Sequence, residues 1–346
     1  MPLTVDWSVT IDGTSYTDRF NRHVIEVEVE DKAGKESDTC RIKLDDTDGA
    51  IILPRKGATI SVSILGEPVF EGKTETPRST GARGQGRILT LTAKSLDSES
   101  KAKEGQHFHK DDATLEDYLK DFAKKAGISS IKVDKELGKI KRAWWGPEGR
   151  SFIHAARQLA DDLGATFKLK GDKAVFAKRG KGETATGGTM PTVMAEWGRN
   201  LISWDIEPYD ARPAVKDVRI SRFDRKAAKF EEEKVDVDLG GRSSASSSAR
   251  LPGTRADKDD AEARGKGKKT ESERDSGGGS IEIDIDPTAK AEGSCELKGA
   301  RDGADGTYRI DGATHSLTRA GATTKMQVKQ PDEKAGQDGR KAGDTK

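Results

Sequence analysis

The chain has 346 residues, enough for two to four domains with a sizeable total core. Only 32% of its residues are hydrophobic and 35% are charged, which favours several small domains with long loops, or wide β-sheet interfaces between subunits, over one compact globule. The net charge of +1 excludes a global electric field that would attract nucleic acid or an anionic membrane surface.

The cysteine content and the apolar runs indicate a reducing compartment and no stable membrane binding. Cys40 and Cys295 lie far apart and nothing in the sequence pairs them. The N-terminal sequence MPLTVDW lacks the charged-then-apolar pattern of a secretion signal. The longest apolar run, residues 50–53, is far too short to span a bilayer.

Residues 1–94 are predicted to form a first β domain. Apolar residues alternate with Glu26, Glu28 and Glu30 in one strand and with Arg41 and Lys43 in the next. If these strands pair, an acidic face lies beside a basic one, and each opposite-charge pair contributes ~0.2–1 kcal/mol. Further alternating strands are expected at residues 60–64, 69–72 and 89–93. Short strands with Gly/Pro turns favour a small barrel or sandwich.

Residues 95–180 are predicted to form an α/β module with two helices and a hairpin. Apolar residues at helical spacing run from Leu115 to Ala126, after a Thr114–Asp117 capping pair, and again over residues 152–163. Glycine follows both helices, as in a left-handed cap. Strands are expected at residues 166–170 and 173–178 around a two-residue turn. A bulky loop with Trp144 and Trp145 lies between the helices, and packing is its expected role.

Residues 181–330 are predicted to form a second β domain. Residues 181–192 have the Gly/Thr-rich composition of a linker, and residues 239–279 read as a polar, mobile excursion with a short helix near 257–263. Residues 331–346 read as a flexible tail. The remaining alternating strands are expected at residues 201–204, 218–223, 281–285, 308–310, 315–317 and 325–328.

A weak internal echo connects the two β domains. Residues 24–35 end in VEVEDKAGK and residues 218–229 end in SRFDRKAAK, each an alternating strand that runs into a charged turn. Such turns are common. If the echo is a true repeat, the first and third domains are versions of one β unit.

The motifs that could carry chemistry fail on inspection. Residues 66–74 approach a phosphate-binding loop, but five residues separate the glycines where four are needed, and Pro77 follows where a helix should begin. His107 and His109 with Asp111 and Asp112 could share a strand face and hold a metal, but no third placed ligand is evident, so a polar strand edge is expected.

Other polar residues also receive structural interpretations. His154 is expected to be solvated, and His315 to be a structural hydrogen-bonding group. The basic run at residues 264–269 is short and flanked by acids, so a solvated loop is expected and no specific nucleic-acid site. Neither G-x-S-x-G nor H-E-x-x-H occurs. The sequence therefore predicts no catalytic, cofactor or metal site, and no enzyme.

The order of the parts resembles the phage late control protein D family, the baseplate hubs of contractile tails, which are related to the N-terminal part of VgrG-type spikes. The resemblance covers residues 1–330 and rests on three regions. The first region comprises TLEDYL at residues 114–119 together with SFI at 151–153 and LADDLGATF at 159–167. The second is VRI at 218–220 with the charged turn that follows it. The third comprises GTYRI at 306–310, THSL at 314–317 and GATTKM at 321–326. A convincing helix before the last strands, usual in this family, is interrupted here by Gly265 and Gly267.

The resemblance implies two similar tail-tube-like β barrels that flank a two-helix α/β domain. It implies a homotrimeric hub that adapts the six-fold tail tube to the three-fold spike, in a virion tail assembled in the host cytoplasm. The implied partners are the spike protein, the tube or tube-initiator protein, the tape measure protein and the baseplate wedge. Two alternatives stay open. One is the hub of a non-viral contractile injection or secretion particle. The other is a tail-tip cell-wall hydrolase, although no extra segment of the chain is long and apolar enough to form a hydrolase domain.

The acidic face of the first strand suggests a further hypothesis. Glu26, Glu28 and Glu30 could line the channel of such a trimer and keep passing DNA from sticking through like-charge repulsion. A solvated outer face is the alternative.

Overall fold

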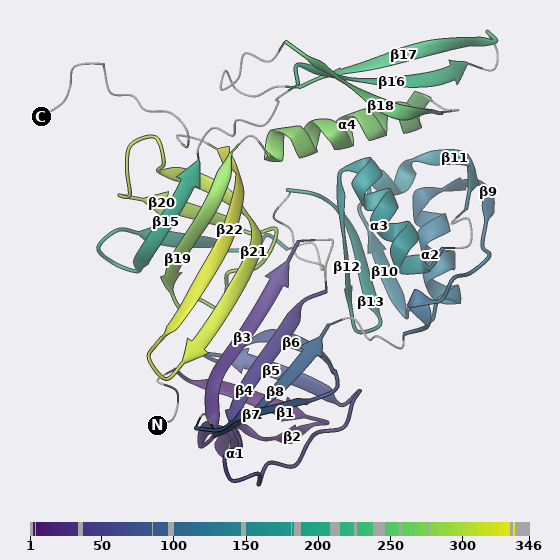
Figure 1. The fold of residues 1–346 in the computed structure, drawn as a ribbon. Helices are drawn as coiled ribbons and strands as arrows, with labels where there is room; N and C mark the ends of the chain where they lie inside the picture. Colours follow the sequence, from purple (N-terminus) through teal and green to yellow (C-terminus); the bar gives the residue numbers. More distant parts are fainter. Residues whose placement is uncertain are drawn as a thin grey trace, which may run out of the picture.

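The protein is represented by a computed structural model (Figure 1). It describes the whole chain except residues 1, 2, 4, 34–36, 85, 96–99, 147–149, 181, 183–187, 208–214, 225–226, 238–245, 256–257, 276, 333–334 and 336–346. No helix in the described part is long and apolar enough to cross a membrane.

The N-terminal strands surround one apolar core that extends from Leu3 to Ala93 and includes Leu317 from the C-terminal region. Hydrogen bonding places the main strands in the spatial order β1-β5-β6-β8-β4-β3, with β2 on β1 and β7 on β8. We call this set block one. Its elements are β1 (Trp7–Ile11), β2 (Thr14–Ser15), α1 (Thr17–Asn21), β3 (Val24–Lys32), β4 (Thr39–Asp45), β5 (Thr59–Ile64), β6 (Glu67–Thr74), β7 (Arg78–Ala82) and β8 (Gly86–Lys94).

The C-terminal strands surround a second core, which extends from Val193 to Ala335. Their spatial order is β14-β20-β21-β22-β19-β15. We call this set block two. Its strands are β14 (Thr192–Glu196), β15 (Leu201–Glu207), β19 (Gly278–Asp284), β20 (Ser294–Lys298), β21 (Gly306–Thr318) and β22 (Ala322–Asp332).

The two blocks have the same strand order. If β6 and β7 count as one strand and the small β2 is left aside, both blocks run in space through their first, fourth, fifth, sixth, third and second strands. The pairings have matching directions except one, since β1 is antiparallel to β5 whereas β14 is parallel to β20. Two versions of one β unit are therefore present in the chain.

The echo in the sequence pointed to the wrong strand. β16 (Asp217–Asp224), which contains the echoed residues, lies outside block two in a separate sheet of the order β17-β16-β18. The counterpart of β3 is β15. The two share a position in the strand order, an antiparallel third-strand partner and a β-bulge, which lies between Val24 and Glu26 in β3 and between Leu201 and Ser203 in β15.

The middle module agrees with the pattern of its sequence. Helices α2 (Leu115–Lys125) and α3 (Phe152–Leu163) begin at Thr114 and Ser151, whose hydroxyls accept hydrogen bonds from the backbone N–H three residues later. Gly164 ends α3 in the left-handed conformation. The helices share a core with the sheet β10-β13-β12. The other elements are β9 (Lys110–Thr114), β10 (Ser130–Val133), β11 (Lys141–Trp145), β12 (Ala165–Lys170), β13 (Lys173–Lys178) and the 3-10 helices η1 (Lys101–Lys103) and η2 (Leu137–Lys139).

The predicted mobile excursion at 239–279 is largely ordered structure. It contains β18 (Ser248–Arg255) and the 17-residue helix α4 (Lys258–Arg274), which packs across β16 and β17 (Lys229–Asp236) and against α3 (Figure 1). The prediction of a short helix near 257–263 was therefore too short. Residues 238–245 and the linker residues 181 and 183–187 lie outside the described part of the chain.

The mainly β architecture with a smaller α/β module is confirmed. Closure of each block into a barrel is not found, because no pairing among the described strands joins β1 to β3 or β14 to β15. The prediction of a flexible tail from residue 331 is wrong at its start, since β22 continues to Asp332 and Ala335 is fully buried against Gly306; residues 336–346 lie outside the described part of the chain.

Candidate functional site

A strand pair joins the two blocks into one continuous sheet of 14 strands. Residues 26–32 of β3 lie antiparallel to residues 318–312 of β21, with Val29 opposite His315 and Val27 opposite Leu317 (Figure 1). The side chain of Leu317 is fully buried in the core of block one. At the end of this joint Asp31 accepts a hydrogen bond from the Ala291 N–H at 3.0 Å. The two blocks are thus held by backbone pairing and by shared apolar packing.

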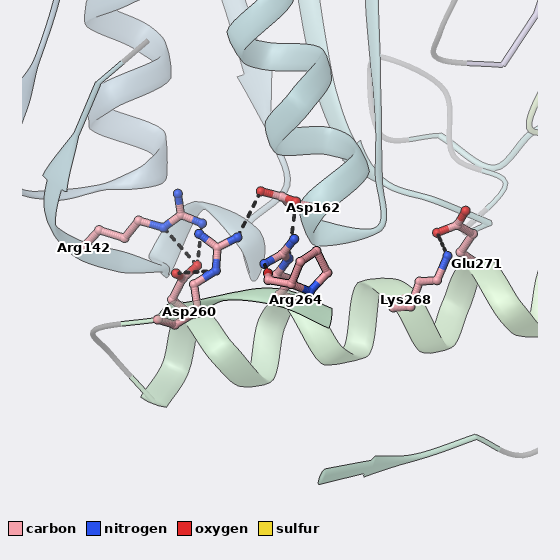
Figure 2. Close-up of polar contacts among 8 residues, drawn as sticks. Arg142, Asp162, Asp260, Arg264, Lys268 and Glu271 are labelled. Carbon is pink, nitrogen blue, oxygen red and sulfur yellow. Dashed lines mark hydrogen bonds and ion pairs between the residues drawn. The ribbon is translucent and has the colours of Figure 1, made fainter. Parts of the chain in front are cut away.

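A second joint connects α4 to the middle module through buried ion pairs (Figure 2). Asp260, with a side chain only 6% exposed, accepts a hydrogen bond from Nε of Arg142 at 2.9 Å. The Arg142 guanidinium also lies 4.2 Å from the ring centre of Trp145. One turn further, Arg264 pairs with Asp162 of α3 at 3.4 Å. These contacts fix α4 on the module although its own sequence has few apolar side chains.

Two glycines allow α4 to approach its neighbours closely. A Cβ on Gly265 would lie 2.6 Å from Cγ2 of Val235, and a Cβ on Gly267 would lie 2.6 Å from the backbone nitrogen of Gly164. The two glycines interrupt the helical pattern in the sequence, but in the structure they are positions at which α4 packs closely against β17 and the end of α3.

A third joint lies where α4, block two and the middle module meet. Arg274 is 4% exposed and pairs with Glu292 at 3.1 Å and with Asp311. Glu292 also accepts hydrogen bonds from the Thr166 hydroxyl and the Gly180 N–H, both at 3.0 Å. Burial opposes the charge of Arg274, but the two carboxylates outweigh it and raise its pKa. This buried network ties the three parts of the chain together.

A cleft of about 620 Å³ lies beside this joint, and several of the polar groups in its lining have structural partners. Lys168 pairs with Asp31. Burial raises the pKa of Asp38 to about 7, against the opposing charge of Lys168 and with support from Asp31. Nδ1 of His315 lies 3.0 Å from the Thr324 hydroxyl, and burial lowers the pKa of its imidazole. His315 is thus a hydrogen-bonding group of the core, as predicted.

The motifs rejected in the sequence lie at ordinary structural positions. Residues 67–74 form β6, which β7 follows where a phosphate-binding loop would be followed by a helix. His107 and His109 are exposed, Asp111 and Asp112 lie on β9, and the described residues contain no group of three metal-ligating side chains. His154 is exposed on α3, as predicted.

Two other interpretations need correction. The predicted loop at Trp144 and Trp145 is strand β11; Trp145 is buried, stacks on Tyr118 and donates to the Ala113 carbonyl at 2.8 Å, whereas Trp144 is 52% exposed. The basic run at residues 264–269 lies on α4 and not in a loop. Its cations have carboxylate partners on α3 or on α4 itself, and these pairs are Arg264–Asp162, Lys266–Glu262, Lys268–Glu271 and Lys269–Glu273.

The acidic face of β3 lies beside the basic face of β4, as predicted. Arg41 pairs with Glu28 at 2.7 Å and Lys43 pairs with Glu26 at 2.5 Å, while Glu30 pairs with Lys32 at 2.9 Å. These cations neutralise much of the negative charge of the strand.

Several strands have one edge without a partner in the described part of the chain, and β7 and β15 are two of them. β7 pairs only with β8, and β15 pairs only with β19. All five residues of β7 are exposed, as are Ile202 and Asp205 on β15. An unpaired strand edge is a template for another chain, so these edges are the candidate assembly surfaces.

Comparison with known proteins identifies relatives of the chain. No family model matches it. The probable baseplate hub protein of Escherichia phage 186 is 29% identical over 195 residues, which cover 55% of this chain and 49% of the relative. That of Escherichia phage P2 is 28% identical over 194 residues, which cover 55% and 50%. The matched region thus spans about half the length of the curated relatives.

Solved structures share the fold over nearly the whole chain. The tail protein from Neisseria meningitidis MC58 superposes with a TM-score of 0.67 at 16% identity, covering 94% of this chain and 96% of that one. The E. coli c3393 protein, described as a component of the type VI secretion system, has a TM-score of 0.57 at 10% identity, covering 96% and 79%. Over 55% of its length this chain is therefore similar in sequence to two probable phage baseplate hub proteins, and over nearly its whole length it shares the fold of these solved structures.

Proposed function

We propose that the chain is a structural baseplate hub of a contractile phage tail, and that three copies adapt a six-fold tail tube to a three-fold spike. The observation that carries this proposal is the repeated strand order, because one chain supplies two similar β blocks already joined edge to edge. Three chains then supply six blocks to the tube and three copies of everything else to the spike. Contacts of this head-to-tail kind form closed rings when the rotation closes.

The proposed domains are a first β domain at residues 1–94, an α/β module at 95–180 and a second β domain at 181–330. Three separate apolar cores support this division. A small fourth core of Val218, Ile220 and Ala261 lies under α4 and belongs to the insertion in the second domain. The buried network around Arg274 supports a fixed arrangement of these parts.

The proposed partners are the spike, the tube or tube-initiator protein, the tape measure protein and the baseplate wedge. The proposed location is the virion tail, after assembly in the host cytoplasm. DNA would pass through the lumen without specific binding. A role for Glu26, Glu28 and Glu30 in repelling DNA stays a prediction, and their pairing with Lys43, Arg41 and Lys32 makes it a weak effect. A trimer map with these side chains outside the bore would refute it.

The same scaffold could serve in a contractile injection or secretion particle. The shared fold with a type VI secretion component supports this alternative, but the curated relatives named as phage hubs favour the virion. The genes beside this one distinguish the two, because a virion needs capsid and packaging genes.

We further propose that the chain has no enzymatic activity. Three titratable groups of the cleft, Lys168, His315 and Glu292, have structural partners, which supports a scaffold role. A peptidoglycan-release assay with the purified chain tests this proposal, and clear release would refute it.

The central experiment is the mass of the assembled protein. Light scattering and native mass spectrometry of the full chain, alone and with the spike protein, should give three chains per particle. A chain that stays monomeric under all assembly conditions would overturn the proposal of a trimeric hub.

A further inference from the structure

The contact between the two blocks uses only one of two equivalent surfaces in each chain. Within the chain, the edge strand of block one, β3, pairs with the outer half of β21 in block two. The equivalent edge strand of block two, β15, pairs with β19 along one edge, and its other edge has no partner in the described part of the chain. Because the blocks repeat each other, the internal joint is a template for the missing contact.

The equivalence of the blocks can be set residue by residue. The N–H of Asp45 donates to the His23 carbonyl, and the N–H of Asp284 donates to the Asn200 carbonyl, so Asp45 matches Asp284 and His23 matches Asn200. The shared bulge then matches Val24 with Leu201. It follows that β3 residues 24–30 match β15 residues 201–207.

The other side of the joint can be matched in the same way. The N–H of Thr74 donates to the Ala58 carbonyl at 2.9 Å, and the N–H of Ile310 donates to the Gly293 carbonyl at 3.0 Å, so Thr74 matches Ile310. The same offset through β7 matches residues 78–82 with residues 314–318 of β21. The pairing with the sixth strand of each block is consistent with this match. Arg78 lies opposite Thr90 of β8, and Thr314 lies opposite Lys325 of β22.

Among the described residues, no strand occupies beside β7 the place that β3 occupies beside β21. One edge of β21 holds two strands end to end, β20 at residues 306–309 and β3 at residues 312–318. On block one, β5 lies along β6, and the next stretch, β7, has all five residues exposed and pairs only with β8. β7 therefore offers a strand-length slot of the same form.

From this repeat, and resting on the proposed hub, we infer that β15 of one chain pairs antiparallel with β7 of a second copy. The register of β3 against β21 within the chain gives the register of β15 against β7 between chains. Glu207 lies opposite Arg78, Ile206 opposite Ser79, Asp205 opposite Thr80, Trp204 opposite Gly81 and Ser203 opposite Ala82. Each added chain repeats the same head-to-tail contact, so three chains close a ring in which internal and intermolecular joints alternate.

The side chains brought together in this register are complementary. Glu207 and Arg78 have opposite charges at directly opposed positions, an arrangement that stabilises strand pairs. Trp204, the largest residue of β15, faces Gly81, which has no side chain to oppose it. A shift by one residue would place Glu207 opposite Ser79 and would turn every side chain of β15 to the other face of the sheet.

The rims of the proposed contact expose apolar side chains that a monomer leaves in water. On β15 and the turn before it, Ile202 is 47% exposed and Trp197 is 57% exposed. Ile25, the counterpart of Ile202 in the internal joint, is half-buried. On the other side, Ile52 and Leu53 in the segment before β5 are 91% and 56% exposed. The segment with the same position before β20 contains Ala291, which contacts β3 in the internal joint.

Engineered disulfides test the register in the full chain. Directly opposed residues in antiparallel strands alternate between wide and narrow pairs, and the narrow pairs suit a disulfide. Two double variants, Ser79→Cys with Ile206→Cys and Thr80→Cys with Asp205→Cys, therefore cover both cases. Under mild oxidation with copper phenanthroline, at least one should form covalent trimers on a non-reducing gel. The control pair Ser79→Cys with Ser203→Cys lies out of register and should not cross-link.

Charge reversal gives a second measurement that needs no cysteine. Arg78→Glu and Glu207→Arg should each lower the trimer fraction in sedimentation at least tenfold at low salt, and the double variant should restore it. The pairing would be overturned if trimers form but neither in-register pair cross-links, or if neither charge reversal lowers the trimer fraction. Either result would leave the proposed hub function standing. A chain that stays monomeric and uncross-linked under all assembly conditions would overturn both.

Discussion

Gly267 of α4 lies directly against Gly164, the residue that ends α3. A Cβ on Gly267 would lie 2.6 Å from the Gly164 nitrogen and 2.7 Å from the Leu163 carbonyl carbon. These neighbours are backbone atoms, which cannot rotate away as a flexible side chain would. The contact between α3 and α4 therefore depends on the absence of two side chains.

Gly267→Ala should destabilise the protein, although alanine is the better helix former. The clash with backbone outweighs the gain of about 1 kcal/mol in helix propensity, and overpacking leaves a net loss of about 1–3 kcal/mol. Urea unfolding followed by circular dichroism measures the change. Gly321→Ala is the matched control, because a Cβ there meets no atom within 4 Å. Equal stability of the two variants would refute the packing argument.

Asp260→Ala should loosen α4 from the middle module. The substitution leaves the guanidinium of Arg142, which is 16% exposed, without its carboxylate, and breaking such a pair costs about 2–4 kcal/mol. Limited proteolysis should cut near α4 sooner than in the parent chain. Lys268→Ala removes the exposed pair with Glu271 on the same helix and should cost at most about 0.5 kcal/mol. A small effect at Asp260 would show that packing alone holds the helix.

Asp38→Asn should stabilise the protein at alkaline pH and much less at acid pH. Burial raises the pKa of Asp38 to about 7, so the folded chain holds a proton that the unfolded chain releases near the ordinary carboxyl pKa of 3.8. The stability that this proton contributes is complete below pH 3.8 and is lost as the pH rises through 7.

Chemical unfolding at pH 5 and pH 8 measures this effect. The advantage of Asp38→Asn over the parent chain should grow by about 2–3 kcal/mol between the two values. Asp48→Asn changes an exposed carboxylate and should show no such growth. A constant difference between Asp38→Asn and the parent chain would contradict the assignment.

Both cysteines should resist thiol reagents in the folded protein. Burial raises the pKa of Cys40 and of Cys295 to about 12, which leaves little thiolate at pH 8. Ellman's reagent should detect no thiol before denaturation and two after it. Rapid reaction of one thiol in the native protein would contradict this expectation, and it would also require a cysteine-free background for the cross-linking experiment.

The parts that could be predicted from the sequence are those with local signals. α2 and α3 have apolar residues at helical spacing and hydroxyl caps at Thr114 and Ser151. α4 lacks such a period, because its buried face consists of Ala261, two glycines and charged residues whose partners lie on distant segments. Those partners are known only once the chain is folded.

The repeat was predicted, but from the wrong strand. The charged turn after residue 218 resembles the turn after β3 although β16 belongs to another sheet. A better signal was present: Arg22-His23-Val24-Ile25 and Arg199-Asn200-Leu201-Ile202 open β3 and β15 alike, and both strands continue to a glutamate. Strand order and bulge position revealed this match, since they depend on pairing between distant segments.

The place where α4 and its three strands enter block two has an evolutionary consequence. They replace the short turn that joins β3 to β4 in block one, and they leave between Glu207 and Gly278, which are direct partners across β15 and β19. A segment with adjoining ends can be lengthened without separating the two strands that flank it, whereas loss of α4 would also remove the buried Arg274 network. Chains of this architecture are therefore expected to tolerate longer insertions between β15 and β19, and shorter ones only where other contacts replace those of α4.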